Sequence, residues 1–413
     1  MLDTQTNSQD AEPKLPFDLN PLRRSLLAGS AYAGVLALFR PAVALAQAPA
    51  APRPLPALAS FKDPGSMIVH SSSTIETRRA AMGLVVTPVN QLYVRNNLNP
   101  PDASVVAKPD AWQVQVEGVR RPATLTLAEL KKMPTETVTM VLQCSGNGRG
   151  YFPSKPSGTP WQTGAAGCVM WTGVPVKELA RRLGGVDRVA KFMTGTGGEV
   201  LPAGVDPKTR VERSVPVAAV EDALLAWELN GQPIPLAHGG PLRLIVPGYT
   251  GVNSVKYVKR LAFTEVESDA NIQQTNYRMT PSDEKSYRPS DPSVWQMQPK
   301  SFVTAPLPES GPLRAGRTRV EGLAFGGMHD VAKVDVSVDG GATWKPARLV
   351  GPDLGRYAWR RFEADVDLPA GEHVITSRMT DTRGTVQAEQ RIENKGGYMN
   401  SSWRDHAVKV TVA

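Results

Sequence analysis

Glycine and proline recur along the whole chain, and this limits the possible folds more than any other feature of the sequence. The 413 residues include 36 glycines and 36 prolines. Proline cannot donate a main-chain hydrogen bond and glycine favours turns, so both residues tend to end regular elements early. We therefore predict a loop-rich α+β fold with many short strands, and not a bundle of long helices.

The spacing of apolar residues divides the chain into two regions. Over residues 61–297, short strand-like runs are mixed with a few helical ones. The predicted strands are Trp112–Val119 and Leu242–Val246, and the predicted helices are Thr126–Met133, Val174–Leu183 and Pro216–Leu229. Thr126 and Glu129 have the spacing of a capping box, which marks the start of a helix. This mixture predicts a mixed α/β domain.

From residue 298 onward, the pattern is that of strands alone. Lys333–Val338 alternates polar and apolar residues, Asp339-Gly340-Gly341 follows as a hairpin turn, and Thr343 begins the return strand. Further strands are predicted at Phe362–Leu368, Glu372–Met379 and Ala407–Val412. This spacing is typical of a β-sandwich, so we predict an all-β immunoglobulin-like domain over residues 298–413.

The N-terminus has the features of an export signal. Arg23 and Arg24 precede the uncharged stretch Ser25–Phe39, and small-residue cleavage signals follow at Ala44-Leu45-Ala46. A membrane anchor is the alternative, but the stretch is shorter than the roughly 20 apolar residues that span a bilayer. We expect a twin-arginine signal over residues 1–46, a flexible lead-in over residues 47–60, a periplasmic location, and no membrane span after signal removal.

Charge and cysteine content exclude several classes of protein. The formal charge is +8, but Asp and Glu interleave the Lys and Arg residues, so we expect a solvated basic surface and no nucleic-acid partner. Only two cysteines, Cys144 and Cys168, are present, which excludes a disulfide framework, a Cys-rich zinc site and a covalently attached c-type haem. The five histidines are scattered. A metal is therefore expected only within an organic cofactor.

The segment LQCSGNGRGYF, residues 142–152, carries the strongest chemical signal. Cys144 follows the apolar run Val138–Leu142 and precedes a glycine-rich turn that reaches Arg149. A strand that delivers a thiolate into a tight turn beside a cation is what a reactive or metal-binding cysteine needs. From these residues alone, a buried structural cysteine remains the alternative. Cys168 has no such surroundings and is expected to be a packed thiol.

Four segments, in the same order, resemble the sulfite oxidase family of molybdopterin enzymes, in the form of a haem-free periplasmic sulfite dehydrogenase of bacteria. LQCSGNGR (142–149) is similar to the family's Leu-Gln-Cys-Ala-Gly-Asn-x-Arg loop. The other similar segments are LYVRNNLNPP (92–101), LLAWELNGQPIPLAHGGPLRLIVPGYTGVNSVKYVKRL (224–261) and VDVSVDGGATW (334–344). The resemblance implies a molybdopterin-binding catalytic domain over residues 61–297, a dimerisation domain over residues 298–413, and a homodimer.

The resemblance also implies the residues of the site. Cys144 would bind molybdenum, and the catalytic pocket for the substrate anion would contain Arg95, Arg149, Trp161 and Tyr277. The residues implied for cofactor binding are Tyr93, Val94, Arg95, Asn96, Asn97, Cys144, His238, Arg243, Ser254, Val255 and Lys256. These types suit their tasks, because guanidinium groups give charge-assisted hydrogen bonds to oxyanions and a thiolate is a soft metal ligand.

A few positions depart from the family's pattern. Asn97 stands where the family commonly has His, and an amide cannot titrate. Gly240 replaces an aromatic residue. The family's acidic cofactor contact falls within residues 195–199, where the register does not assign a residue. Lys395 is a candidate for the third cation of the pocket, which some relatives take from the C-terminal domain.

The predicted activity is the molybdenum-dependent oxidation of sulfite to sulfate. Because no haem domain or haem motif is evident in this chain, electrons are expected to pass to an external c-type cytochrome. The alternative enzyme is a sulfane dehydrogenase subunit of a sulfur-oxidation system, which would need a wider and more exposed pocket. A cofactor-free binding protein of the same fold is the alternative outside enzymes, but Cys144, Arg95, Arg243 and Lys256 argue against it.

Overall fold

The computed structural model describes residues 53–413, so the predicted signal over residues 1–46 lies outside the described residues. Its α-helices are short: α1 Ser104–Ala107, α2 Leu127–Leu130, α3 Val176–Arg182 and α4 Asn271–Gln274. The strands of the first region are β1 Met67–Ser71, β2 Thr74–Thr77, β3 Val94–Arg95, β4 Gln113–Glu117, β5 Ala123–Thr126, β6 Glu136–Gln143, β7 Ala166–Pro175, β8 Phe192–Thr196, β9 Glu212–Pro216, β10 Leu224–Leu229, β11 Gln232–Pro233, β12 Arg243–Ile245 and β13 Arg260–Thr264. Those of the second region are β14 Lys300–Ala305, β15 Gly316–Phe325, β16 Val331–Ser337, β17 Lys345–Val350, β18 Arg360–Leu368, β19 Gly371–Asp381 and β20 Val408–Val412.

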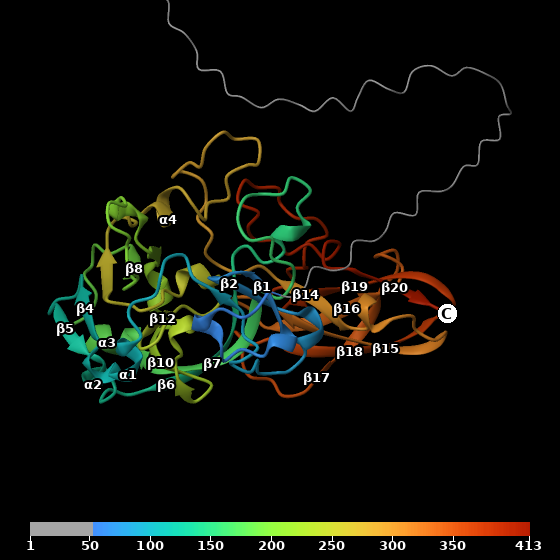
Figure 1. Cartoon of the computed structure of the whole chain (residues 1–413), viewed down its shortest axis with the longest axis horizontal. Helices are drawn as coiled ribbons and strands as arrows, with labels where there is room; N and C mark the ends of the chain where they lie inside the picture. The colour runs from blue at the N-terminus through green and yellow to red at the C-terminus, as the bar shows by residue number, and fades with distance from the viewer. Residues whose placement is uncertain (1–52) are drawn as a thin grey trace, which may run out of the picture. The chain divides into compact units, whose positions relative to one another are not determined.

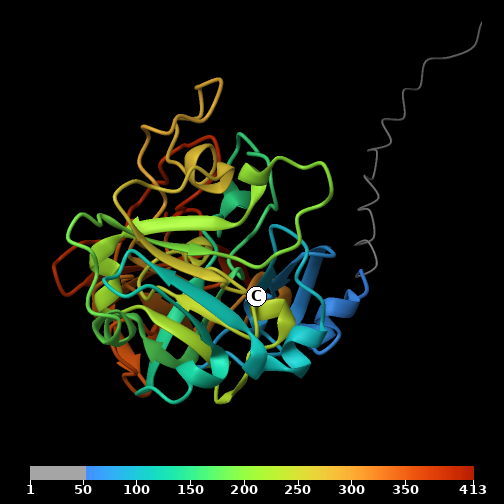
Figure 2. The same cartoon turned by 90° about the vertical axis from the view of Figure 1, so that its left-hand side faces the viewer.

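Three sheets build the first region, on the left and in the centre of Figure 1. One has the order β5-β4-β13-β8-β9, with β13 and β4 parallel. The second has the order β11-β10-β7-β6, with β12 paired to β10, and the third is β1-β2-β3. Figure 2 views the same fold from the side of β4, β5 and β8. Among residues 53–413, no helix is long and apolar enough to cross a membrane.

Most of the predicted elements of this region are present, and one prediction is wrong. Thr126 caps α2, since its hydroxyl accepts from the Glu129 N–H at 3.2 Å and the Glu129 carboxylate accepts from the Thr126 N–H at 2.7 Å. The helix predicted over Pro216–Leu229 does not form. Its first half is a 3-10 turn, Val217–Glu221, and its second half is the strand β10. Because β10 is buried between β7 and β12, its continuous apolar run has no alternation that would distinguish a strand from a helix.

The flexible lead-in predicted over residues 47–60 is wrong for its described part. Ala57–Ala59 form a 3-10 turn, and Ala59 is buried. Leu55 and Leu58 pack against the same apolar cluster, which also contains Ala59 and Val94. This burial orders residues 55–59, because apolar side chains removed from water hold the backbone that carries them.

The second region is the predicted β-sandwich. Its strands follow the pairing order β14-β15-β18-β17-β16-β19-β20, and β14 also contacts β19, so the sheet closes upon itself. The predicted hairpin is present, because Val336 of β16 pairs with Lys345 of β17. The expected α+β class, with a mixed domain followed by a β-rich domain, is confirmed.

The two regions share a buried core and belong to one compact unit. Apolar side chains from both sides form one cluster, in which Val141 and Cys168 meet Phe302, Leu323 and Trp359. Burial raises the pKa of the Cys168 thiol to about 12, so Cys168 is a packed thiol, as predicted. The N–H of Val141 donates to the carbonyl of Tyr357 at 2.8 Å. The second region is thereby bound directly to β6, the strand that ends at Cys144.

Candidate functional site

Cys144 follows directly after β6, a strand whose last four residues are buried. Its N–H donates to the carbonyl of Ala165 at 2.9 Å, which keeps it in line with β7. The chain then turns sharply: Asn147 N–H donates back to the carbonyl of Cys144 at 3.0 Å, and Gly148 has a φ of +86°. A residue with a side chain rarely adopts this φ, so the turn requires glycine. The thiol is therefore presented by a rigid strand and a tight turn.

Two cavities meet at Cys144. An inner cavity of about 50 Å³ and an outer cavity of about 330 Å³ are both lined by this residue. Volumes of roughly 300–1,000 Å³ are typical of small-molecule sites, and the outer cavity falls at the lower end of this range. Both cavities are lined by Arg95, Asn97, Cys144, Val211 and Tyr277. The cysteine predicted to bind a metal thus lines both cavities.

The inner cavity collects almost all the residues predicted for cofactor binding. Its lining includes Tyr93, Arg95, Asn96, Asn97, Cys144, His238, Arg243, Ser254, Val255 and Lys256. Val94 is the exception. Its side chain packs in the apolar cluster with Ile75 and Ala237, because alternate residues of β3 point to opposite faces.

Three basic side chains, those of Arg95, Arg243 and Lys256, line the inner cavity. The buried Arg243 donates to the carbonyls of Ser254 at 3.1 Å and His238 at 2.8 Å. Burial lowers the pKa of Arg243 to about 10, so it remains charged at neutral pH. Burial, with Arg243 nearby, also holds the pKa of Lys256 well below its usual range. Such a wall suits a ligand with a negatively charged group.

Glu199 lines the inner cavity and Lys62 contacts its lining residue His238, and neither residue is assigned to the site by the sequence. The Lys62 Nζ contacts the His238 Nε2 at 2.7 Å, and burial lowers the pKa of Lys62 to about 6. Glu199 lines the inner cavity, and burial raises its pKa to about 7. The sequence limits the acidic contact to residues 195–199, but only the fold selects Glu199. No sequence pattern marks Lys62, because its partner His238 lies 176 positions away.

The outer cavity collects the residues predicted for the substrate anion. Arg95, Arg149, Trp161 and Tyr277 all line it, together with Tyr287 and Tyr398. The buried Arg149 donates to the carbonyls of Gly396 at 2.8 Å and Thr159 at 3.1 Å, and its guanidinium lies 5.2 Å from the Tyr398 ring centroid. All of these hydrogen-bond acceptors are neutral. The pocket therefore presents two guanidinium groups beside the thiol.

Lys395 is not part of the outer cavity, and its prediction as the third cation is wrong. Its Nζ donates to the carbonyl of Glu284 at 3.0 Å. The second region instead contributes the phenol of Tyr398, whose ring stacks on that of Tyr277 with centroids 5.0 Å apart. Tyr277 also donates a long hydrogen bond to the Asn97 Oδ1 at 3.4 Å, and both residues line both cavities.

Hydrogen bonds from the second region also fix the turn that follows Cys144, residues 145–148. The Lys300 Nζ donates to the Asn147 Oδ1 and to the carbonyl of Asn400, both at 2.8 Å. The N–H of Met399 donates to the carbonyl of Ser145 at 2.9 Å, and the Asn400 side chain donates to the carbonyl of Gly148 at 3.0 Å. Residues 145–148 are thus fixed by contacts with residues 300–400.

The inner cavity has unsatisfied polar atoms that fit a pterin with a phosphate. The Asn96 Nδ2, a donor, and the Glu199 Oε2, an acceptor, are buried without a hydrogen-bond partner among residues 53–413. Buried polar groups are nearly always satisfied, so these two atoms indicate a ligand that both accepts and donates hydrogen bonds. The cations suit a phosphate, Glu199 suits pterin N–H groups, and the Cys144 thiol suits a soft metal.

Comparison with known proteins agrees with this chemistry. Residues 101–272 match the oxidoreductase molybdopterin binding domain, and residues 291–413 match the Mo-co oxidoreductase dimerisation domain. The solved structure of the sulfane dehydrogenase SoxCD from Paracoccus pantotrophus is similar, with a TM-score of 0.69 and 26% identity, and the match covers 84% of this chain and 89% of that one.

The sequence relatives include sulfite oxidases and a nitrate reductase. The chain is 32% identical to the sulfite oxidase of Gallus gallus over 335 residues, which is 77% of this chain and 72% of that protein. It is 30% identical to the mitochondrial sulfite oxidase of Homo sapiens, covering 79% of this chain and 62% of the relative. It is 31% identical to an inducible nitrate reductase of Glycine max, of which it spans 39%. The chain therefore belongs to the sulfite oxidase family, and its cofactor is molybdenum held by molybdopterin.

Proposed function

We propose that the protein is a periplasmic sulfite dehydrogenase that passes electrons to an external c-type cytochrome. The observation that carries this proposal is the outer cavity, in which Arg95 and Arg149 face the same space as Cys144. A small oxyanion needs such planar, charged donors. Relatives named sulfite oxidase, at 30–32% identity, support sulfite as the substrate.

The residues of the inner cavity would hold the cofactor. Cys144 would bind molybdenum through its thiolate, Arg243, Lys256, His238 and Ser254 would hold the phosphate end, and Glu199 with Asn96 would bind the pterin. When bound, the cofactor supplies two-electron redox chemistry and an oxygen atom for transfer. The overall reaction converts sulfite and water into sulfate, two protons and two electrons.

The residues of the outer cavity would bind and orient the anion. Arg95 and Arg149 would neutralise its charge, and the Tyr277 hydroxyl would donate its hydrogen bond to the anion in place of the Asn97 Oδ1. The buried Trp161, in edge contact with Tyr93 at 6.2 Å, would exclude water from one wall. This arrangement fixes the substrate beside Cys144 before reaction, and orientation of this kind lowers the barrier of a bimolecular step.

The periplasmic location and the acceptor rest on the sequence. Arg23-Arg24 and the cleavage signal that follows support twin-arginine export. The two cysteines lie 24 positions apart, at 144 and 168, and cannot form a Cys-x-x-Cys-His haem attachment. A separate protein would then take the electrons one at a time.

A sulfane dehydrogenase is a second candidate, favoured by two observations. The outer cavity, at about 330 Å³, is larger than sulfite alone requires, and the similar solved structure is named a sulfane dehydrogenase. A carrier protein with a bound sulfane sulfur would need this access. Sulfite and thiosulfate assayed side by side separate the two candidates.

The test uses molybdenum-loaded protein with cytochrome c or ferricyanide as acceptor. We expect sulfite-dependent reduction by the natural protein, and none by the Cys144→Ser variant, because the hydroxyl cannot replace a soft metal ligand. Cys168→Ser is the matched control and should keep the activity, since Cys168 lies in the apolar core. Full activity of Cys144→Ser would remove this residue from the mechanism. No turnover of sulfite by the natural protein would contradict the proposed function.

A further inference from the structure

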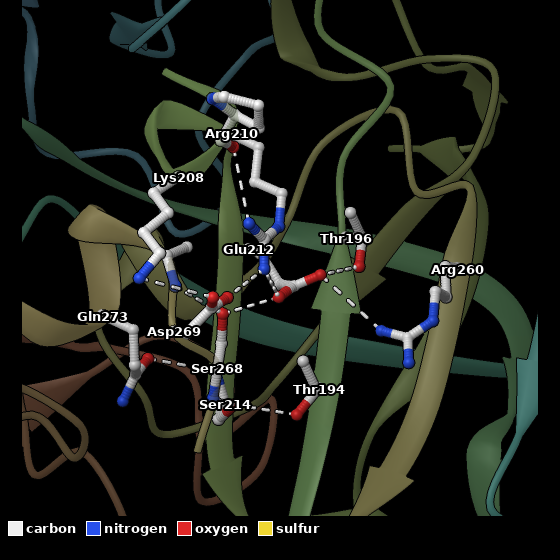
Figure 3. Close-up of polar contacts among 12 residues, drawn as sticks. Thr194, Thr196, Lys208, Arg210, Glu212, Ser214, Arg260, Ser268, Asp269 and Gln273 are labelled. Atoms are coloured by element: carbon white, nitrogen blue, oxygen red, sulfur yellow. Dashed lines mark hydrogen bonds and ion pairs between the residues drawn. The ribbon is translucent and has the colours of Figure 1, made fainter.

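The strand β9 has a charged residue on each of two opposite faces, and only one of the charges is neutralised. On the first face, Glu212 accepts from Arg210 at 2.8 Å and from Ser268 at 2.6 Å, and it lies 3.6 Å from the Arg260 guanidinium. Figure 3 shows these contacts, together with those of Thr196 and Asp269. Cations and carboxylates therefore compensate each other on this face.

Arg213 points away from this network and has only neutral partners. It is 1% exposed, and its guanidinium donates to the carbonyl of Ile272 at 2.7 Å and to the Asn253 Oδ1 at 3.1 Å. It also donates to the Ser293 Oγ at 3.1 Å and, more weakly, to the carbonyl of Val294 at 3.5 Å. Among residues 53–413, no carboxylate lies within 4.0 Å of it. The nearby Glu267 is paired with Arg278.

An uncompensated buried charge destabilises the folded protein, so the retention of this arginine calls for an explanation. Burial lowers the pKa of Arg213 to about 10, and the guanidinium therefore keeps its charge at neutral pH. Inside a protein, where the effective dielectric is low, a fixed charge acts over a longer distance than at the surface. Arg213 is thus a permanent positive charge within the protein interior.

Arg213 lies next to Tyr277, a residue that lines the outer cavity, without lining that cavity itself. Its guanidinium carbon is 5.7 Å from the centroid of the Tyr277 ring. Tyr277 lines both cavities beside Cys144. Arg213 donates hydrogen bonds to the carbonyls of Ile272 and Val294. The Val294 N–H in turn donates to the Tyr277 carbonyl at 2.8 Å. Arg213 therefore also fixes the backbone that carries Tyr277.

We propose that Arg213 is a positioning residue that supplies a third positive charge to the oxyanion pocket from behind Tyr277. Arg95 and Arg149 contact the pocket directly, whereas Arg213 acts through the ring of Tyr277 and through its own electric field. No carboxylate beside Arg213 cancels this field, and the pocket gains affinity for a dianion. This inference rests on the proposed function, since it assumes that the substrate is an oxyanion.

Calorimetric binding of sulfate to the molybdenum-loaded protein tests this role without turnover. We expect Arg213→Gln to raise the Kd for sulfate by at least about fivefold, because one charge is lost from a low-dielectric pocket. Arg213→Lys should bring the Kd back to within about twofold of the natural value at pH 6, where the lysine is charged. The matched control is Arg260→Gln, which removes a charge that Glu117 and Glu212 compensate, and its Kd should stay within about twofold.

Equal Kd values for Arg213→Gln and the natural protein would overturn the inference. An equal loss of sulfate affinity in the Gln and Lys variants would overturn it as well, because it indicates a purely structural role. Should Arg213→Gln not fold, the Lys variant decides alone. Its Kd, divided by the natural value, should rise from pH 6 to pH 9 as the buried lysine loses its proton, and a constant ratio would contradict the proposal. Sulfite oxidation by the natural protein is measured separately, so a failure of the proposed function is distinguishable from a failure of the role of Arg213.

Discussion

Glu199 is a carboxyl group in a cavity whose other charged side chains are cations. Its Oε2 has no hydrogen-bond partner among residues 53–413, and burial raises its pKa from 4.5 to about 7. The positive charges of Lys256 and Arg243 lower the pKa, but they offset the burial only in part. A carboxyl group in this state is suited to bind a ligand that donates hydrogen bonds, and without the ligand it destabilises the protein.

Replacement of Glu199 by Gln should therefore stabilise the cofactor-free protein in a pH-dependent way. Because the pKa in the folded state is raised, the folded protein binds more protons than the unfolded chain between pH 4.5 and 7. The stability contributed by this group is present below pH 4.5 and is lost as the pH rises through 7. We expect Glu199→Gln to gain up to about 3 kcal/mol in unfolding free energy at pH 8, and almost nothing at pH 4.5.

Urea unfolding at the two pH values measures this difference. Glu265→Gln is the control, because Glu265 is 61% exposed in a surface ion pair and should show no comparable change. An equal gain at both pH values would show that the effect does not come from the ionisation of Glu199.

At the scale of elements, the turn after β6 depends on the second region as much as on its own sequence. Lys300, the first residue of β14, binds Asn147 within the turn and Asn400 in the C-terminal loop. Lys300 is 1% exposed, and burial lowers its pKa to about 7. The Asn147 Nδ2 donates to the carbonyl of Thr163 at 2.7 Å, which extends the contact to the chain beside β7.

We expect Lys300→Met to lower the free energy of unfolding by about 1–3 kcal/mol, because it leaves the Asn147 Oδ1 and the Asn400 carbonyl buried without a donor. The molybdenum content per chain should fall as well, since the turn that carries Cys144 loses its support. Urea unfolding and metal analysis measure the two effects. Lys333→Met, at a position 61% exposed, is the control and should change neither. Unchanged values for both variants would mean that Lys300 does not hold the turn.

At the scale of the whole molecule, the second region folds as a β-sandwich and also forms part of the outer cavity. It contributes Tyr398 to the outer cavity, and its Gly396 carbonyl accepts a hydrogen bond from Arg149. It also shares a buried core with β6 and β7. It also matches a domain described as one of dimerisation. Assembly through this region would therefore act on a part of the protein that is already coupled to the site.

We predict that the mature protein is a homodimer, because a self-complementary face on the sandwich closes with two-fold symmetry. Sedimentation equilibrium should give twice the mass of one chain at micromolar concentration. The same measurement on Arg213→Gln should also give a dimer, since Arg213 lies inside the first region. A single-chain mass for the natural protein would contradict the prediction.

Local patterns in the sequence predicted the parts that depend on neighbours along the chain. The capping box at Thr126, the hairpin between β16 and β17, and the strand that delivers Cys144 all follow from residues close together in sequence. The helix predicted over Pro216–Leu229 is wrong because a buried strand and a buried helix can have the same apolar run. Only the pairing of β10 with β7 and β12 distinguishes the two structures.

The sequence by itself determined the chemistry available to this protein: one thiol in a glycine turn, and arginines in motifs whose order identifies the family. The tertiary structure alone decided which charges are compensated. Glu199, Lys300 and Arg213 are ordinary charged residues in the sequence, and Lys395, a candidate for the pocket, lies outside it. The reason is physical: burial and the distance to an opposite charge set the energy of an ion, and both are fixed by residues far apart along the chain.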